Sequence, residues 1–203
     1  MNTIQKLSEL FRRFPGIGPR QAKRFVYFLL TQNDSYRREL ADLILTLKND
    51  ISICPRCLRY FTKTGSMTFC TTCSDESRDQ SLLMLVEKDM DLENVEKSKL
   101  FNGLYFVLGG VVPILEKEPE KRIRIKDLEK RLAKESGIIK ELIFALSVNP
   151  DGDNTHDYLI EHLTPLSTKH DFKFSSLGRG LSTGSELEYS DPETIKNALK
   201  NRQ

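Results

Sequence analysis

Apolar positions in the first fifty residues recur every three or four residues, the spacing of one helix face. The pattern predicts a helix over residues 3–14, a second helix after the turn "PGIGP", and a third from about Tyr36 to Lys48. The positions expected to point inward are Ile4, Leu7, Leu10, Phe11 and Phe14, then Ala22, Phe25, Val26 and Leu29, and then Leu40, Leu43, Ile44 and Leu47.

The pattern changes after Gln80, where short apolar runs alternate with helical stretches. The runs are 82–86, 103–110, 141–146 and the weaker 172–176, and the helices are expected at about 89–99, 125–136 and 155–166. Such alternation is typical of a parallel sheet with helices on both faces. The last residues open with glycines and close in a short helix that begins at Asp191 and Pro192.

These patterns predict an α+β chain of several parts. We expect a helical region at residues 1–52, a small four-cysteine module at 53–78 made of loops and small strands, an α/β domain with a mainly parallel sheet at 79–176, and a glycine-rich tail with a helix at 177–203. A chain of 203 residues is long enough for this without disulfides.

The formal net charge is only +2, so the total charge indicates little and only its local distribution is informative. No acidic residue lies between Glu9 and Asp34, whereas Arg12, Arg13, Arg20, Lys23 and Arg24 all do. A local basic cluster favours a polyanion or an acidic partner, and a solvated helix face is the alternative. The chain offers no apolar stretch for a signal peptide or a membrane span, so we expect a cytoplasmic protein.

The cysteines form two paired hooks. Cys54 and Cys57 belong to "CPRC", and Cys70 and Cys73 belong to "CTTC", with 12 residues between the hooks. Doubled Cys-x-x-Cys spacing predicts a tetrahedral zinc site, and four thiolates leave no open position on the ion, so the zinc would be structural. Two disulfides or four unrelated thiols are the alternatives, which the cytosolic setting and the doubled spacing disfavour.

The turn "PGIGP" predicts an anion site. The first amides of the helix that follows lack partners, and Gly16 and Gly18 would let another molecule approach them closely. Pro19 suits the first helical position, and Arg20, Lys23 and Arg24 follow within a turn and a half. We therefore expect a sequence-independent grip on a DNA backbone. A tight turn with Ile17 filling the core is the alternative. The motif resembles the helix-hairpin-helix of DNA repair proteins.

Three carboxylates follow the apolar runs. Glu87 comes directly after "LLMLV", and Asp151 and Asp153 follow "ELIFAL" within "DGD". If the strands are neighbours, these side chains converge at one edge of the sheet and could hold Mg²⁺, with Gly152 letting the two aspartates splay apart. An ordinary turn is the alternative. The arrangement resembles the Toprim domain, in which the glutamate works as general acid/base and the aspartates hold magnesium.

The order of these parts resembles the RecR family of bacterial recombination mediators. The resemblance covers nearly the whole chain and rests on "FPGIGPRQAKR", "CPRC…CTTC…RD", "LVE", "YFVLGG", "DGDNT" and "GRGLSTGSELEYSD". It implies a non-catalytic, DNA-binding protein that assembles as a homodimer or ring-like homotetramer able to encircle DNA. Family members work with RecO and RecF to help load RecA onto gapped DNA.

The resemblance also implies roles for particular residues. Lys23 and Arg24 would face DNA, while Glu87, Asp151 and Asp153 would form an acidic surface that engages RecO. The zinc module and the tail from Gly178 to Asp191 would support assembly.

The chain departs from the family at several places. Phe106 stands where a histidine is usual, and Ser182 and Ser185 replace a proline and a glycine. "PILEKEPEKRIRI" replaces a glycine- and proline-containing loop.

An enzyme is the second class of function that the sequence allows. A magnesium-dependent Toprim nuclease would use Glu87 as acid/base and Asp151 and Asp153 as metal ligands. A topoisomerase would need a tyrosine nucleophile on a separate domain, and a primase would need more chain.

Overall fold

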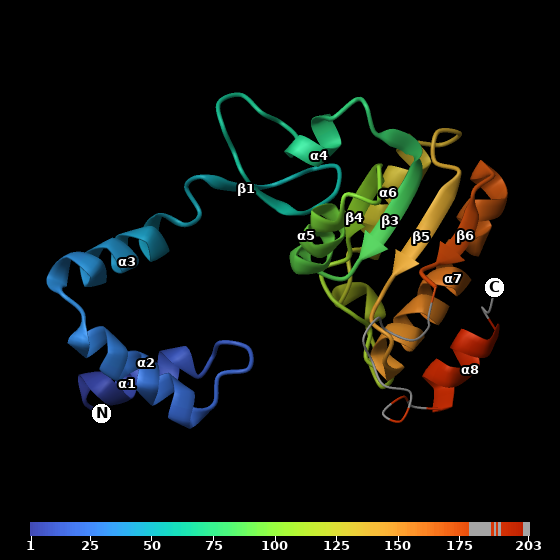
Figure 1. Cartoon of the computed structure of the whole chain (residues 1–203). Helices are drawn as coiled ribbons and strands as arrows, with labels where there is room; N and C mark the ends of the chain where they lie inside the picture. The colour runs from blue at the N-terminus through green and yellow to red at the C-terminus, as the bar shows by residue number, and fades with distance from the viewer. Residues whose placement is uncertain (179–187, 189, 191, 201–203) are drawn as a thin grey trace. The chain divides into compact units, whose positions relative to one another are not determined.

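In the computed structural model the chain divides after Ile51 into two units, Met1–Ile51 and Ser52–Gln203 (Figure 1). The structure describes residues 1–178, 188, 190 and 192–200. No helix within these ranges is both long and apolar enough to cross a lipid bilayer.

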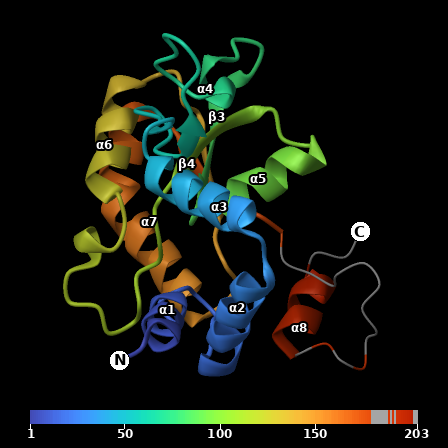
Figure 2. The same ribbon diagram turned by 90° about the vertical axis from the view of Figure 1, so that its left-hand side faces the viewer.

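Three helices form the first unit: α1 (Thr3–Phe11), α2 (Pro19–Thr31) and α3 (Asp34–Thr46). Asn2 caps α1 in a reciprocal pair with Gln5, and Asn33 caps α3. Helices α1 and α2 lie side by side (Figure 2), and the rings of Phe11 and Phe25 meet edge to face at 5.6 Å. The expected inward face of α2 is confirmed, because Ala22 and Val26 are buried.

The predictions for the first and third helices were partly wrong. Helix α1 ends at Phe11, and Phe14 is exposed. Helix α3 buries none of its residues, and Leu43 and Ile44 are 61% and 62% exposed. Near the start of α3, Arg37 donates to the backbone oxygens of Leu29 and Gln32. Farther along, Leu40 is half-buried, and Leu40 and Ile44 line a pocket shared with α1 and α2 and are not packed tightly against them.

The cysteine segment contains short strands, as expected: β1 (Ile51–Ile53) leads into it and β2 (Tyr60–Thr62) lies within it. It also contains a short helix that was not expected, α4 (Thr71–Ser74). A four-stranded sheet follows, with the order β4-β3-β5-β6 and parallel pairing throughout, which confirms the prediction. Its strands are β3 (Asp79–Val86), β4 (Gly103–Val107), β5 (Glu141–Ala145) and β6 (Lys173–Ser176).

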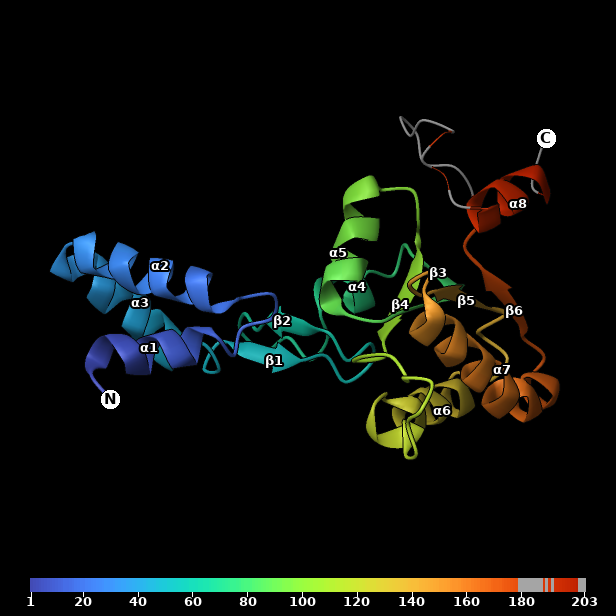
Figure 3. The same cartoon turned by 90° about the horizontal axis from the view of Figure 1, so that it is seen from below.

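Helices cover both faces of this sheet (Figure 3). Leu83 and Leu85 of β3 pack with α6 (Ile125–Lys134) and α7 (Pro150–His170), whereas Met84 and Val86 pack with α5 (Asp89–Ser98). The two faces alternate along the strand because successive side chains of a strand point to opposite sides. The remaining helical elements are the 3₁₀ turn η1 (Pro119–Lys121) and α8 (Pro192–Lys200).

Helix α7 begins five residues earlier than expected, at Pro150. Asn149 caps it by accepting from the amide of Gly152 at 2.8 Å, and Pro150 takes the first helical position. The "DGD" motif therefore lies in the first turn of a helix and not in a loop. Helix α8 matches the expected terminal helix, although Asp191 lies outside the described residues.

Candidate nucleic-acid interface and metal centre

The turn between α1 and α2 has the backbone that its glycines predict. Gly16 has φ +74°, a left-handed conformation that favours glycine, whereas Gly18 is extended and is the N-cap of α2. A Cβ at either glycine would meet nothing within 4 Å. The space in front of both glycines is therefore open to another molecule.

The start of α2 leaves backbone donors without a capping side chain. Gly18 has none to offer, and the first backbone hydrogen bond runs from Ala22 to the Gly18 oxygen at 3.0 Å. Pro19 has no N–H, so the amides of Arg20 and Gln21 are the donors at this exposed end. They point the positive end of the helix dipole toward the open space.

Three cations flank these amides. Arg20, Lys23 and Arg24 are exposed, and the first turn of α2 contains no acidic residue. Within the described part of the chain none of the three forms an ion pair, whereas Arg12 pairs with Glu9 at 2.8 Å. The geometry suits an external anion.

The four cysteines come together in the second unit. Cys54, Cys57, Cys70 and Cys73 are all buried and unbridged, and their Sγ atoms lie within 4.8 Å of one another. The Sγ atoms of Cys57 and Cys70 are 3.6 Å apart. Tetrahedral zinc with Zn–S bonds of about 2.3 Å places neighbouring sulfurs about 3.8 Å apart, so this donor set fits zinc.

The surroundings of the cysteines also favour a cation. Hydrogen bonding to Cys54 and then burial raise the pKa of Cys57, and the same causes raise the pKa of Cys73. The thiols therefore cannot all ionise by themselves near neutral pH. A divalent cation offsets the charge of thiolates that crowd together, and it would be held by all four sulfurs.

The first cysteine hook is anchored to the sheet domain by three successive backbone oxygens. The oxygen of Arg56 accepts from Arg131 at 2.9 Å, that of Cys57 from the amide of Val107 at 2.8 Å, and that of Leu58 from Arg124 at 2.6 Å. The cysteine module and the sheet therefore share one hydrogen-bond network, and loss of order in the module would disturb the sheet.

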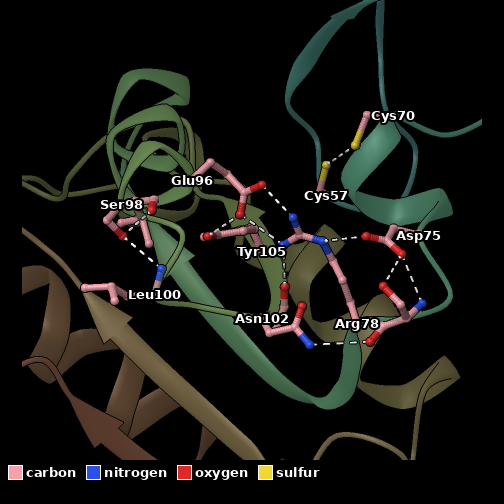
Figure 4. Close-up of polar contacts among 12 residues, drawn as sticks. Cys57, Cys70, Asp75, Arg78, Glu96, Ser98, Leu100, Asn102 and Tyr105 are labelled. Atoms are coloured by element: carbon pink, nitrogen blue, oxygen red, sulfur yellow. Dashed lines mark hydrogen bonds and ion pairs between the residues drawn. The ribbon is translucent and has the colours of Figure 1, made fainter.

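Arg78 forms a second connection to the module (Figure 4). Its guanidinium binds both carboxylate oxygens of Glu96 on α5, at 2.9 and 2.6 Å, and lies 3.5 Å from Asp75. Tyr105 donates to the same glutamate at 2.7 Å. Burial acts to raise the pKa of Glu96, but the bonds from Arg78 and Tyr105 outweigh it and keep this pKa low.

Sequence analysis missed the structural roles of Arg78, Arg124 and Arg131. Each arginine is far along the chain from its partners, so no local spacing marks it. The only signal was the "RD" that follows the second hook, and it gave no hint of Glu96.

The three carboxylates do not form a metal site in the described residues. Among those residues, the four cysteines are the one group of three or more His, Cys, Asp or Glu side chains close enough to share an ion. Glu87 is only 5% exposed and accepts from the amide of Ser147 at 2.5 Å. Asp151 and Asp153 are half-buried in the first turn of α7, where negative charge suits the helix dipole.

Gly152 is required by packing and not by the need to separate two aspartates. A Cβ at this position would lie 1.9 Å from the backbone oxygen of Ser147. The expected role of Gly152 was wrong, because the residue lets the start of α7 approach the end of β5 closely.

The residues that depart from the family pattern lie in different parts of the structure. Phe106 is buried in the core cluster that packs against α6 and α7. The segment "PILEKEPEKRIRI" contains η1 and ends with Ile123 and Ile125, both buried. Ser182 and Ser185 lie outside the described residues.

Comparison with known protein families gives three matches along the chain. Residues 4–47 match the RecR helix-hairpin-helix model, residues 81–177 match the Toprim domain model, and residues 180–203 match the RecR C-terminal model. The matches follow the order of the parts expected from the sequence.

Curated relatives span the whole chain. The chain is 36% identical over 200 residues to "Recombination protein RecR" of Bifidobacterium longum (strain DJO10A), covering 98% of this chain and 95% of the relative. It is 35% identical over 200 residues to the protein of the same name from Roseiflexus castenholzii, with 98% and 93% coverage. For Chloroflexus aggregans the identity is 34%, with the same coverage.

Proposed function

The chain belongs to the RecR family of recombination proteins, and from this premise we propose that it is a DNA-binding recombination mediator in DNA repair. The observation that carries the DNA-binding part is the open turn before α2, with uncapped amides and three exposed cations that form no ion pair among the described residues. Such a surface binds phosphates and does not read bases.

The test of this interface is a double variant, Lys23→Ala with Arg24→Ala. Two lost phosphate contacts should lower the slope of log affinity against log salt by about 1.8 for duplex DNA. At about 0.1 M salt this corresponds to a roughly 10- to 100-fold weaker complex. Fluorescence anisotropy with labelled duplexes of unrelated sequence measures both quantities, and the loss should be the same for every sequence.

The matched control removes two cations elsewhere in the same unit, Lys6→Ala with Lys48→Ala, both exposed. This control should bind as the parent does. Equal affinity of the Lys23/Arg24 variant and the parent would refute the assignment. Gly18→Ala separates the amide site from charge alone. Its added Cβ meets nothing within 4 Å among the described residues, so the variant should fold normally, yet the methyl group should hinder the approach of a phosphate.

We propose further that the start of α7 binds the partner protein RecO. RecO and RecF would both act with this protein to help load RecA on gapped DNA. Asp151 and Asp153 offer carboxylates there, and the buried Glu87 positions Ser147 beside them. Asp151→Asn should weaken the complex with RecO in co-sedimentation and leave DNA affinity unchanged. Loss of both activities together would argue against separate surfaces.

We propose that the protein is not an enzyme. The alternative is a small Mg²⁺-dependent nuclease that uses Glu87, Asp151 and Asp153, although these side chains are not grouped as a metal site among the described residues. Incubation of the pure protein with labelled gapped DNA and Mg²⁺ or Mn²⁺ decides between the two. Cleavage that disappears in Glu87→Gln would favour the nuclease.

Several further proposals accompany the function. We propose that the four cysteines hold a structural zinc. We propose that the protein assembles as a homodimer or homotetramer and forms a ring-like clamp on DNA. We also propose that it is located in the cytoplasm. We also propose the domain boundaries 1–52, 53–78, 79–176 and 177–203. The solution mass, measured with and without DNA, tests the assembly, and a strictly monomeric particle would contradict the clamp.

A further inference from the structure

A pocket of about 560 Å³ lies in the second unit, between the first cysteine hook and α6. Its apolar wall consists of Pro55, Leu58, Phe69 and Phe106, and its polar wall includes Arg131 and Lys134. Phe106 is buried, but Phe69 is 39% exposed, so one aromatic ring is available to a ligand. An accessible ring beside an apolar wall suits a flat aromatic group such as a nucleobase.

A row of lysines runs along α6 beside this pocket. Lys126, Lys130 and Lys134 are spaced four residues apart and all are exposed, so they share one face of the helix. Four helical residues advance about 6 Å, similar to the separation of successive phosphates along a nucleic-acid strand. Lys130 pairs with Asp127 at 3.1 Å, whereas Lys126 and Lys134 form no ion pair within the described part of the chain.

The acidic groups at the pocket are already engaged. Glu135 receives both Arg56, at 2.9 Å, and Arg131, at 3.3 Å, so one carboxylate serves two guanidinium groups. Arg131 is only 6% exposed, and its Nη2 atom has no hydrogen-bond partner among the described residues. The pocket therefore has surplus positive charge, which suits an anionic ligand with oxygen acceptors.

We propose that this pocket and the α6 lysines form a binding site for single-stranded nucleic acid. One base stacks on Phe69 in the pocket, and the neighbouring phosphates lie along Lys126, Lys130 and Lys134. A duplex is disfavoured because its bases are already stacked inside the helix, whereas an unpaired base can be splayed into a pocket. An acidic peptide would use the lysines without needing the aromatic ring. The site shares no residue with the turn before α2.

The first experiment uses the fact that the chain contains no tryptophan. Phe69→Trp introduces a single tryptophan, which can be excited selectively over the tyrosines, into the full-length protein at the expected stacking position. A short thymidine oligonucleotide should quench its fluorescence, whereas an abasic oligonucleotide of the same length should not. Phe69→Ala should lower the affinity for the thymidine oligonucleotide roughly 10-fold, and Phe69→Trp should retain it.

The second experiment tests the charges in the background of Lys23→Ala and Arg24→Ala, so that the α1–α2 turn does not mask the result. Lys126→Gln with Lys134→Gln should weaken binding of the thymidine oligonucleotide roughly 10-fold or more. The matched control is Lys97→Gln with Lys169→Gln, which removes two exposed cations from α5 and α7 and should change nothing.

Three outcomes would overturn the proposal. The first is unquenched fluorescence of the Phe69→Trp variant together with unchanged affinity of the lysine variant. The second is equal affinity for the thymidine and abasic strands. The third is displacement of the strand by a polyglutamate peptide, with no effect of Phe69→Ala on affinity. The last outcome would assign the surface to an acidic protein segment. None of them affects the duplex titrations of Lys23 and Arg24, so failure here is distinguishable from failure of the proposed function.

Discussion

Removal of the proposed zinc by a strong chelator is expected to disorder the cysteine module and to expose all four thiols to a thiol-reactive reagent. The module has almost no apolar core apart from the cysteines and the half-buried Phe61. Structural zinc contributes on the order of 10 kcal/mol to such sites, more than any other interaction in this segment can supply. Cys73→Ser should have the same consequence without a chelator.

Disorder of the cysteine module is expected to destabilise the sheet domain as well. The oxygens of Arg56, Cys57 and Leu58 hold Arg131, Val107 and Arg124 in place, so disorder of the hook removes partners from α6 and from the end of β4. Thermal melting followed by circular dichroism should shift strongly downward together with metal loss. Metal analysis of the parent protein should give about one zinc per chain.

Thr71→Ser is the matched control for this prediction, because Thr71 is exposed and lies between the two cysteines of the second hook. This variant should keep both the metal and the melting temperature. A metal-free parent that melts normally, with its thiols still protected, would show that zinc has no structural role.

Gly152→Ala is expected to destabilise the protein by about 3 kcal/mol or more. The added Cβ would sit 1.9 Å from the backbone oxygen of Ser147, and a backbone atom cannot rotate away as a flexible side chain can. The start of α7 must then move, which also disturbs the bond between Ser147 and Glu87. The melting temperature should fall by roughly 6–12 °C.

Gly178→Ala is the control for this effect, because a Cβ at Gly178 meets nothing within 4 Å among the residues that the structure describes. It should melt as the parent does. A Gly152→Ala protein as stable as the parent would show that the backbone around Ser147 can shift at little cost in free energy, and would contradict the packing role of this glycine.

Local sequence patterns predicted much of this protein correctly. The doubled hooks predicted the cysteine cluster because short spacing brings the two thiols of each hook close together, whatever the rest of the chain does. The runs at 82–86 and 141–146 predicted strands of a parallel sheet because they are too short and too apolar for surface helices.

The sequence-based predictions failed where the surroundings of a side chain are set by residues that are distant along the chain. Leu43 and Ile44 have a helical spacing that predicts burial, but spacing cannot tell how closely another element covers the face, and both side chains are more than 60% exposed. The motif "DGD" is typical of a turn, yet it lies in the first turn of α7 because the helix begins at Pro150, directly after its N-cap residue Asn149. Glu87 follows its strand as expected, but it binds the Ser147 amide and joins no group of metal ligands among the described residues.

The sequence by itself determined the cysteine hooks, the open glycine turn with its cations and the strand–helix alternation, because each depends on residues that are neighbours along the chain. Only the tertiary structure decided which arginines bind the cysteine module, why Gly152 must lack a side chain, and that Phe69, Lys130 and Lys134 border one pocket. The physical reason is that these contacts join residues far apart in the sequence, where packing and not spacing sets the distance.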